Sequence, residues 1–278
     1  MRPLGLTLPA LLLAAAALAQ SPGTPGSPAP KDAAQPVAPK MSEKNQKYLD
    51  AYLGAWQERM AKIETLETKC VLTEIEDGKK TTFTGDISFL KPNYAKLLLK
   101  PQAVPMNPKK VKHLVADGQF LWEYDYGKKI ARVEQLPKDG IGDNMLMSFL
   151  YGKKADEIKK RYDLSIDVED KEKFNEHYLH ITILPKTKED MQEFKKAELV
   201  LWVNNKDPKF TEYWMLPARL WFQQPNGNQI IWEFQKMTTQ KKLVAKDFEA
   251  PGFPDKEWRS DWSKPPAPTI TRTSAPPK

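Results

Sequence analysis

The fold is decided by residues 66–124, which begin with LETKCVLTEIEDGKKTTFTGDISF over residues 66–89. Within that sequence Asp77-Gly78 predicts a type I′ turn, because such a turn needs a positive φ at both central residues. A hairpin closed there pairs Leu72 with Phe83 and gathers apolar side chains on one face, since side chains alternate along a strand. That face consists of Leu66, Thr68, Cys70, Leu72, Phe83, Gly85, Ile87 and Phe89. A one-residue slip would turn the whole set to water, so the sequence specifies this register.

Asp117-Gly118 gives a second turn of the same type later in the stretch. The hairpin that it predicts has one apolar face, on which the pairs are Val115 with Phe120, His113 with Trp122 and Val111 with Tyr124. On its other face Lys112 opposes Glu123, which is a favourable charge pair on a solvent-facing side. The two hairpins together predict a sheet with one apolar, aromatic-rich side.

Asn226-Gly227 predicts a third hairpin near the end of the chain. Its pairs on one face are Trp221 with Trp232, Gln223 with Ile230 and Arg219 with Phe234. With the shorter strand-like segments between the hairpins, about ten strands fit one antiparallel sheet that carries helices on one side. We therefore predict one α+β domain over residues 42–262. The proline-rich residues 20–41 and 263–278 are predicted to be a disordered linker and a disordered tail.

An amphipathic helix is predicted from residue 43 to about Leu66, with Ser42 as its N-cap. Its apolar side chains share an arc of about 100° on a helical wheel. They are Leu49, Tyr52, Leu53, Trp56, Met60 and Ile63. A helix with one apolar face must pack on something, and we expect it to cover the aromatic side of the sheet.

Residues 1–19 are typical of a secretory signal peptide, because Arg2 precedes an apolar run that ends in Ala17-Leu18-Ala19. We expect cleavage before Gln20 and export to the periplasm. A bacterial lipoprotein carries its lipid on a cysteine directly after the cut, whereas the only cysteine here is Cys70. The mature protein is therefore expected to be soluble and unlipidated. Cys70 falls on the apolar face of the first hairpin, where a free thiol acts as a small hydrophobic side chain.

Composition and charge argue against several classes of function. The 278 residues carry 43 basic and 36 acidic side chains in mixed clusters, without the concentrated basic face that nucleic acid requires. His113 lies among apolar residues and is expected in the core, while His177 and His180 project to opposite faces of a strand and cannot share a metal. There is no glycine-rich phosphate loop and no nucleophile elbow. We expect no cofactor, no metal site, no nucleic-acid partner and no enzymatic activity.

The aromatic side of the sheet is the candidate site for a hydrophobic ligand. Its expected ligand-contacting residues are Leu72, Phe83, Ile87, Phe89, Val115, Phe120, Trp122, Tyr124, Trp221, Trp232 and Phe234. Residues 143–151 form a short apolar segment with glycines nearby, and their adaptable side chains suit a lid. The candidate residues of this segment are Met145, Leu146 and Phe149. The alternative is a closed hydrophobic core that holds no ligand.

Several short motifs follow one another along the chain. They are Phe83-Thr84-Gly85, Phe89-Leu90-Lys91-Pro92-Asn93, Ala116-Asp117-Gly118-Gln119-Phe120-Leu121-Trp122-Glu123-Tyr124, Leu216-Pro217 and Trp232-Glu233-Phe234. In this order the chain resembles the outer-membrane lipoprotein carrier proteins, the LolA/LolB-like family, over roughly residues 45–250. The resemblance implies a curved, open antiparallel β half-barrel with a helical lid over a hydrophobic cavity. Lys91 stands where the periplasmic carriers have an arginine that helps hold the lid shut, so it is the lid-latch candidate.

The resemblance also implies a function without a cofactor. A monomeric, exported carrier would shuttle acylated lipoproteins or acyl lipids from an inner-membrane donor to an outer-membrane acceptor. Each buried methylene is worth ~0.8 kcal/mol, so an apolar cavity that covers about ten of them gains ~8 kcal/mol. Two alternatives stay open: a periplasmic regulatory protein of the same fold that senses a lipid or lipoprotein, and an enzyme built on this fold.

Overall fold

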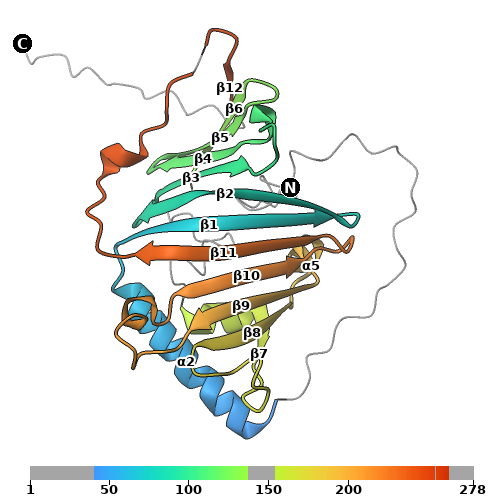
Figure 1. The fold of residues 1–278 in the computed structure, drawn as a ribbon, viewed down its shortest axis with the longest axis vertical. Helices are drawn as coiled ribbons and strands as arrows, with labels where there is room; N and C mark the ends of the chain where they lie inside the picture. The colour runs from blue at the N-terminus through green and yellow to red at the C-terminus, as the bar shows by residue number, and fades with distance from the viewer. Residues whose placement is uncertain (1–40, 137–153, 254, 263–278) are drawn as a thin grey trace, which may run out of the picture.

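The structure, a computed structural model, describes residues 41–136, 154–253 and 255–262. In these ranges twelve strands form one open sheet, in the order β12-β6-β5-β4-β3-β2-β1-β11-β10-β9-β8-β7 (Figure 1). Their bounds are β1 (Thr65–Glu76), β2 (Lys79–Leu90), β3 (Tyr94–Pro101), β4 (Lys112–Asp117), β5 (Phe120–Asp125), β6 (Ile130–Gln135), β7 (Tyr162–Ser165), β8 (Tyr178–Pro185), β9 (Lys196–Trp202), β10 (Pro217–Gln223), β11 (Gln229–Thr238) and β12 (Arg259–Trp262). The predicted α+β fold with an open antiparallel sheet is confirmed. The described strands number twelve rather than about ten, and β12 runs parallel to β6.

Three helices accompany the sheet in the described ranges, namely α2 (Glu43–Ala61), α4 (Ala155–Arg161) and α5 (Lys188–Glu193), with short 3-10 turns η1 (Pro108–Lys110), η2 (Thr211–Tyr213) and η3 (Ala245–Phe248). The Ser42 side chain caps α2 by accepting a hydrogen bond from the Asn45 backbone N–H at 3.1 Å, as predicted. Leu49, Leu53, Trp56 and Met60 form its buried stripe.

The helix α2 ends earlier than the sequence predicted. It stops at Ala61 rather than near Leu66, because Leu66 already pairs with Phe89 in the β1–β2 hairpin. Cross-strand pairing and burial of Leu66 therefore override the helical pattern at this point. Outside the described residues lie the predicted signal peptide, the linker up to residue 40, the segment 143–151 and the tail from residue 263.

The first hairpin has the predicted register. Leu72 pairs with Phe83, and Asp77 and Gly78 have φ of 49° and 77°, as a type I′ turn requires. The apolar set of this hairpin is buried on one face. Alternation and turn type therefore specified this hairpin together.

The second hairpin is shifted by two residues from the prediction. Val115 pairs with Trp122 rather than with Phe120, and His113 pairs with Tyr124 rather than with Trp122. The Asp117 carboxylate explains the longer turn. It accepts hydrogen bonds from the backbone N–H groups of residues 119 and 120 at 3.0 and 2.8 Å, and from the indole N–H of Trp122 at 2.7 Å. This side-chain turn replaces the predicted two-residue turn.

The third hairpin is shifted by one residue, which moves side chains to the other face. Trp232 pairs with Leu220, and Trp221 pairs with Ile231, so the predicted pairing of the two tryptophans is wrong. The loop has three residues, 225–227, and is closed by a hydrogen bond of 2.8 Å from the Gln224 N–H to the Asn228 carbonyl. Pro225 presets the φ of a type I turn, and Gly227 takes the left-handed position with φ of 92°.

The register defines two faces of the sheet, which we call the helix face and the strap face. The helix face carries the apolar set of the first hairpin, and α2 packs on it. The strap face is the opposite side, and the chain after β11, residues 239–253 and 255–262, forms a strap against its β3–β6 part. Figure 1 shows this strap leaving β11 in the middle of the sheet and ending in β12 at its edge.

Aromatic contacts attach the strap to the sheet. Phe248 packs on Tyr94 with ring centroids 5.8 Å apart, and the Tyr124 hydroxyl donates to the Pro251 carbonyl at 2.8 Å. Further along the strap, Trp258 packs on Tyr124 and Tyr126, and Trp262 packs on Phe120 and Trp122. Trp258, Val115, Tyr124 and Ala131 form a small buried core that is separate from the main one.

The prediction of one aromatic face is therefore wrong, since the aromatic residues are divided between the two faces. Four of the predicted site residues lie on the strap face of β4 and β5, namely Val115, Phe120, Trp122 and Tyr124. Trp221 lies on the same side of the sheet, where its indole N–H donates to the Gln229 amide oxygen at 2.9 Å.

Candidate functional site

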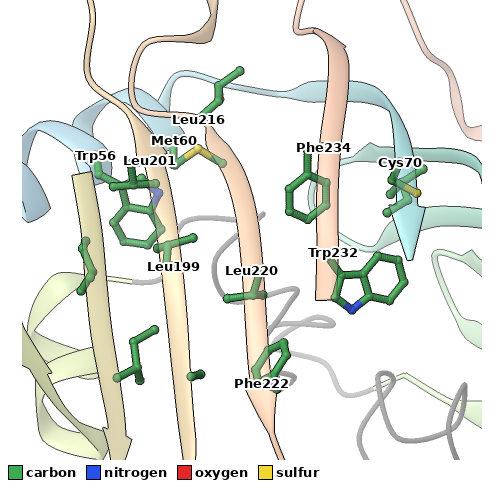
Figure 2. Packing of buried hydrophobic residues seen from close by; sticks show 14 of the residues in the cluster. Trp56, Met60, Cys70, Leu199, Leu201, Leu216, Leu220, Phe222, Trp232 and Phe234 are labelled. Carbon is green, nitrogen blue, oxygen red and sulfur yellow. The ribbon is translucent and has the colours of Figure 1, made fainter. Parts of the chain in front are cut away.

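The helix face is an apolar surface that extends across most of the sheet. Buried side chains follow one another across it from β8 to β4, and Figure 2 shows those of β9, β10, β11 and β1. Of the predicted site residues, this face holds Leu72, Phe83, Ile87, Phe89, Trp232 and Phe234, all buried. Their role as ligand contacts remains a prediction. Met145, Leu146 and Phe149 lie outside the described residues.

The described helices lie toward one end of this face. Figure 1 shows α2 running along the β7–β10 end, and in Figure 2 its Trp56 and Met60 lie near Leu201 and Leu216. The Gln57 amide oxygen accepts a hydrogen bond of 2.8 Å from the first residue of α4, which fixes the two helices together. The other half of the helix face, on β1–β4, is therefore the candidate site.

The β1–β4 half contains residues that the sequence did not reveal. We call it the β1–β4 site and define it by Leu72, Phe83, Ile87, Leu97, Leu99 and Leu114, all buried. Residues 97–99 are three leucines in succession, so alternation could not assign a face to any of them. The pairing does so, because Leu97 lies between Ile87 and Leu114.

A buried ion pair crosses the apolar surface of the β1–β4 site. The Lys112 ammonium lies 2.8 Å from a carboxylate oxygen of Glu74, and their side chains are only 7% and 11% exposed. The same ammonium lies 4.8 Å from the centre of the Phe83 ring. Burial raises the pKa of Glu74, and Lys112 opposes this shift. The predicted solvent-side pair of Lys112 with Glu123 is wrong, because Glu123 pairs with Arg132 at 3.3 Å instead.

Lys91 connects the end of β2 to the end of α2. Its ammonium donates to the Met60 carbonyl at 2.5 Å, and its backbone N–H donates to the Glu64 carbonyl at 2.9 Å. A cation is favourable at a helix C-terminus, where carbonyl groups lack partners within the helix. Burial lowers the pKa of Lys91. Its predicted role as a lid latch stays a prediction, because the segment 143–151 is outside the described residues.

Two polar atoms on the helix face have distinct environments. The Cys70 thiol is buried, and burial raises its pKa to about 12, so it is packed as a small hydrophobic group. The indole N–H of Trp232 is buried without a hydrogen-bond partner, and the residue is 1% exposed. An unsatisfied buried donor costs about 1–3 kcal/mol, and the indole N–H of Trp202, which packs against the same core, shares this feature.

Neither a metal centre nor a membrane-spanning helix is found in the part of the chain that the structure describes. Its histidines and acidic residues form no group that could hold a metal ion. None of its helices is long and apolar enough to cross a bilayer.

The chain is similar to several solved structures at low sequence identity. No family model and no curated protein matches it. An uncharacterized conserved protein from Thermus thermophilus is 10% identical, with 77% of this chain and 99% of that chain covered and a TM-score of 0.43. The LolA superfamily protein NE2245 from Nitrosomonas europaea is 9% identical, with 72% and 97% covered and a TM-score of 0.36. A putative outer membrane lipoprotein-sorting protein domain from Vibrio parahaemolyticus is 14% identical, with 74% and 97% covered and a TM-score of 0.35.

The superfamily that the sequence motifs resemble is thus among the matches. What this protein binds has to be inferred from its own helix face.

Proposed function

We propose that this protein is a carrier that binds an acyl chain at the β1–β4 site. The observation that supports the proposal is that the apolar helix face continues well past the helices described at its β7–β10 end. Each buried methylene is worth ~0.8 kcal/mol, so covering about ten of them supplies ~8 kcal/mol of binding free energy. A soluble protein can supply this only from a large apolar surface, and the side chains of the β1–β4 site are buried in the structure without a ligand.

Two features of the sequence support an exported carrier. Residues 1–19 are typical of a signal peptide, and the motifs around Gly85 and Asp117 resemble the lipoprotein carriers. The proposed cargo is an acylated lipoprotein or an acyl lipid, taken from an inner-membrane donor and delivered to an outer-membrane acceptor.

A regulatory protein that senses lipid is the second candidate. The observation that favours it is the open sheet, whose edge strands β7 and β12 each pair with one strand in the described ranges. An extended segment of a partner protein could add a strand at such an edge. A sensor would capture one membrane protein reproducibly in a pull-down, whereas a carrier would release its cargo to membranes.

Adjacent leucines on opposite faces provide the test of the acyl site. Leu97 lies on the helix face and Leu98 on the strap face of β3. An environment-sensitive fatty-acid probe should bind the wild type, and Leu97→Gln should weaken binding by about tenfold or more, because an amide replaces about two methylene contacts. Leu98→Gln should bind like the wild type.

Urea titrations must first show that both variants are folded at the assay temperature. Equal loss of affinity in the two variants would contradict a site on the helix face. A folded wild type that binds no probe would mean that the apolar face is closed core.

A further inference from the structure

The buried ion pair of Lys112 and Glu74 is placed where an alkyl chain would lie. Lys112 is on the helix face of β4, and its side chain reaches across β3 and β2 to Glu74 on β1. On its way it passes the Phe83 ring, 4.8 Å from the ammonium nitrogen. Leu99 lies opposite Lys112, and Glu74 lies between Ile230 of β11 and Thr81 of β2.

Such a pair is not explained by stability alone. Removing two charges from water costs several kcal/mol per ion, and apolar residues of similar size often stabilise a core equally well. The raised pKa of Glu74 is consistent with this cost, because burial outweighs the attraction of Lys112. The pair therefore points to a role in recognition.

A second polar group lies in the same region. Leu72 pairs with Phe83 on one side and with Trp232 on the other, so the three form one row across β2, β1 and β11. Glu74 is the next residue of β1 on this face. Trp232, whose buried indole N–H has no hydrogen-bond partner, is therefore a diagonal neighbour of Glu74 on this face.

Building on the proposed acyl-chain function, we propose that Lys112 binds the anionic head group of the ligand, a carboxylate or a phosphate. The chain lies along the apolar residues of the β1–β4 site, and the head group forms a charge-assisted hydrogen bond with the Lys112 ammonium. Glu74 holds the ammonium in place when no ligand is bound and gives way to the ligand anion. Glu74 then takes up a proton from solvent, so the site stays neutral when the head group carries a single negative charge.

Three ligands with the same alkyl chain test this assignment: hexadecanoate, hexadecyl phosphate and hexadecanol, each titrated below its aggregation concentration. The wild type should bind one or both anions at least about tenfold more tightly than the alcohol, as expected for one charge-assisted hydrogen bond in a buried site. The stronger of the two anions identifies the source, a fatty acid or a phospholipid. Lys112→Met should abolish the preference for the anions over hexadecanol. Lys100→Met, which removes an exposed lysine of β3, should behave like the wild type.

Lys112→Met leaves the Glu74 carboxylate buried without an opposite charge, which can prevent this variant from folding. The double variant Glu74→Gln/Lys112→Met avoids this charge and should also lose the preference. Equal wild-type affinity for the alcohol and the anions would overturn the role of Lys112 and leave the acyl site standing. The role of Lys112 would also be overturned if the folded double variant still bound the anions more tightly than the alcohol. If the folded wild type binds none of the three ligands, the proposed function fails as well.

Discussion

Gly85→Ala should lower the free energy of unfolding by at least about 3 kcal/mol. Gly85 lies in β2 opposite Leu99 of β3, and a Cβ atom there would be 1.8 Å from the Leu98 carbonyl oxygen and 2.9 Å from its carbon. These are backbone atoms, so the overlap cannot be relieved by rotating a side chain. The two strands would have to separate, at the expense of the hydrogen bonds between them.

The matched control is Gly54→Ala in α2, where a new Cβ atom would meet nothing within 4 Å apart from the adjacent backbone of its own helix. Alanine should stabilise the helix interior there by about 0.5–1 kcal/mol. Urea unfolding of both variants, followed by circular dichroism, measures the difference. Two variants with the same midpoint would show that β2 and β3 do not approach this closely at Gly85.

His113 should make the protein less stable as the pH falls from about 6.5 to about 4. Its ring is stacked on Tyr124 with centroids 4.6 Å apart, and Nδ1 is 3.0 Å from the Tyr126 hydroxyl. Burial, and then the charge of Lys96, lower the pKa of His113 from 6.5 to about 4. The unfolded chain therefore binds this proton first as the pH falls. The stabilisation is complete above pH 6.5 and is lost toward pH 4, by up to about 3 kcal/mol.

His113→Phe should unfold with a flatter pH dependence than the wild type. Carboxylates also titrate below pH 5. The informative quantity is therefore the fall in urea midpoint from pH 7 to pH 4.5, which should be larger for the wild type than for His113→Phe. Tyr124 and Tyr126, whose rings stack on His113, stay neutral in this range because burial raises the pKa of both hydroxyls. Parallel curves for the two proteins would contradict a neutral, buried His113.

The three hairpins show what short-range patterns determine. At Asp77-Gly78 the turn type and the apolar alternation agree, and the predicted register is correct. At Asp117 a carboxylate that accepts three hydrogen bonds lengthens the turn, and Pro225 does so in the third hairpin. Because side chains alternate, the single-residue error in the third hairpin placed Trp221 on the wrong face.

The division of the aromatic residues between two faces depends on contacts that are distant in sequence. Adjacent positions of β4 and β5 are both apolar, so alternation cannot say which residue faces the main core. Trp258 and Trp262 of the strap settle the question by covering Tyr124 and Trp122. The pairing of Lys112 with Glu74 is equally distant, because two strands lie between them. No local signal predicts it.

The central claim, that the β1–β4 site holds an acyl chain, is tested most directly by extracting the protein itself. The mature protein is purified without detergent from the cells that produce it naturally, extracted with organic solvent, and its lipids are quantified by mass spectrometry. The wild type and Leu98→Gln should yield acyl lipid in amounts comparable to the protein, and Leu97→Gln should yield much less. The claim is contradicted if folded wild-type protein yields no acyl lipid and takes up none when incubated with lipid vesicles.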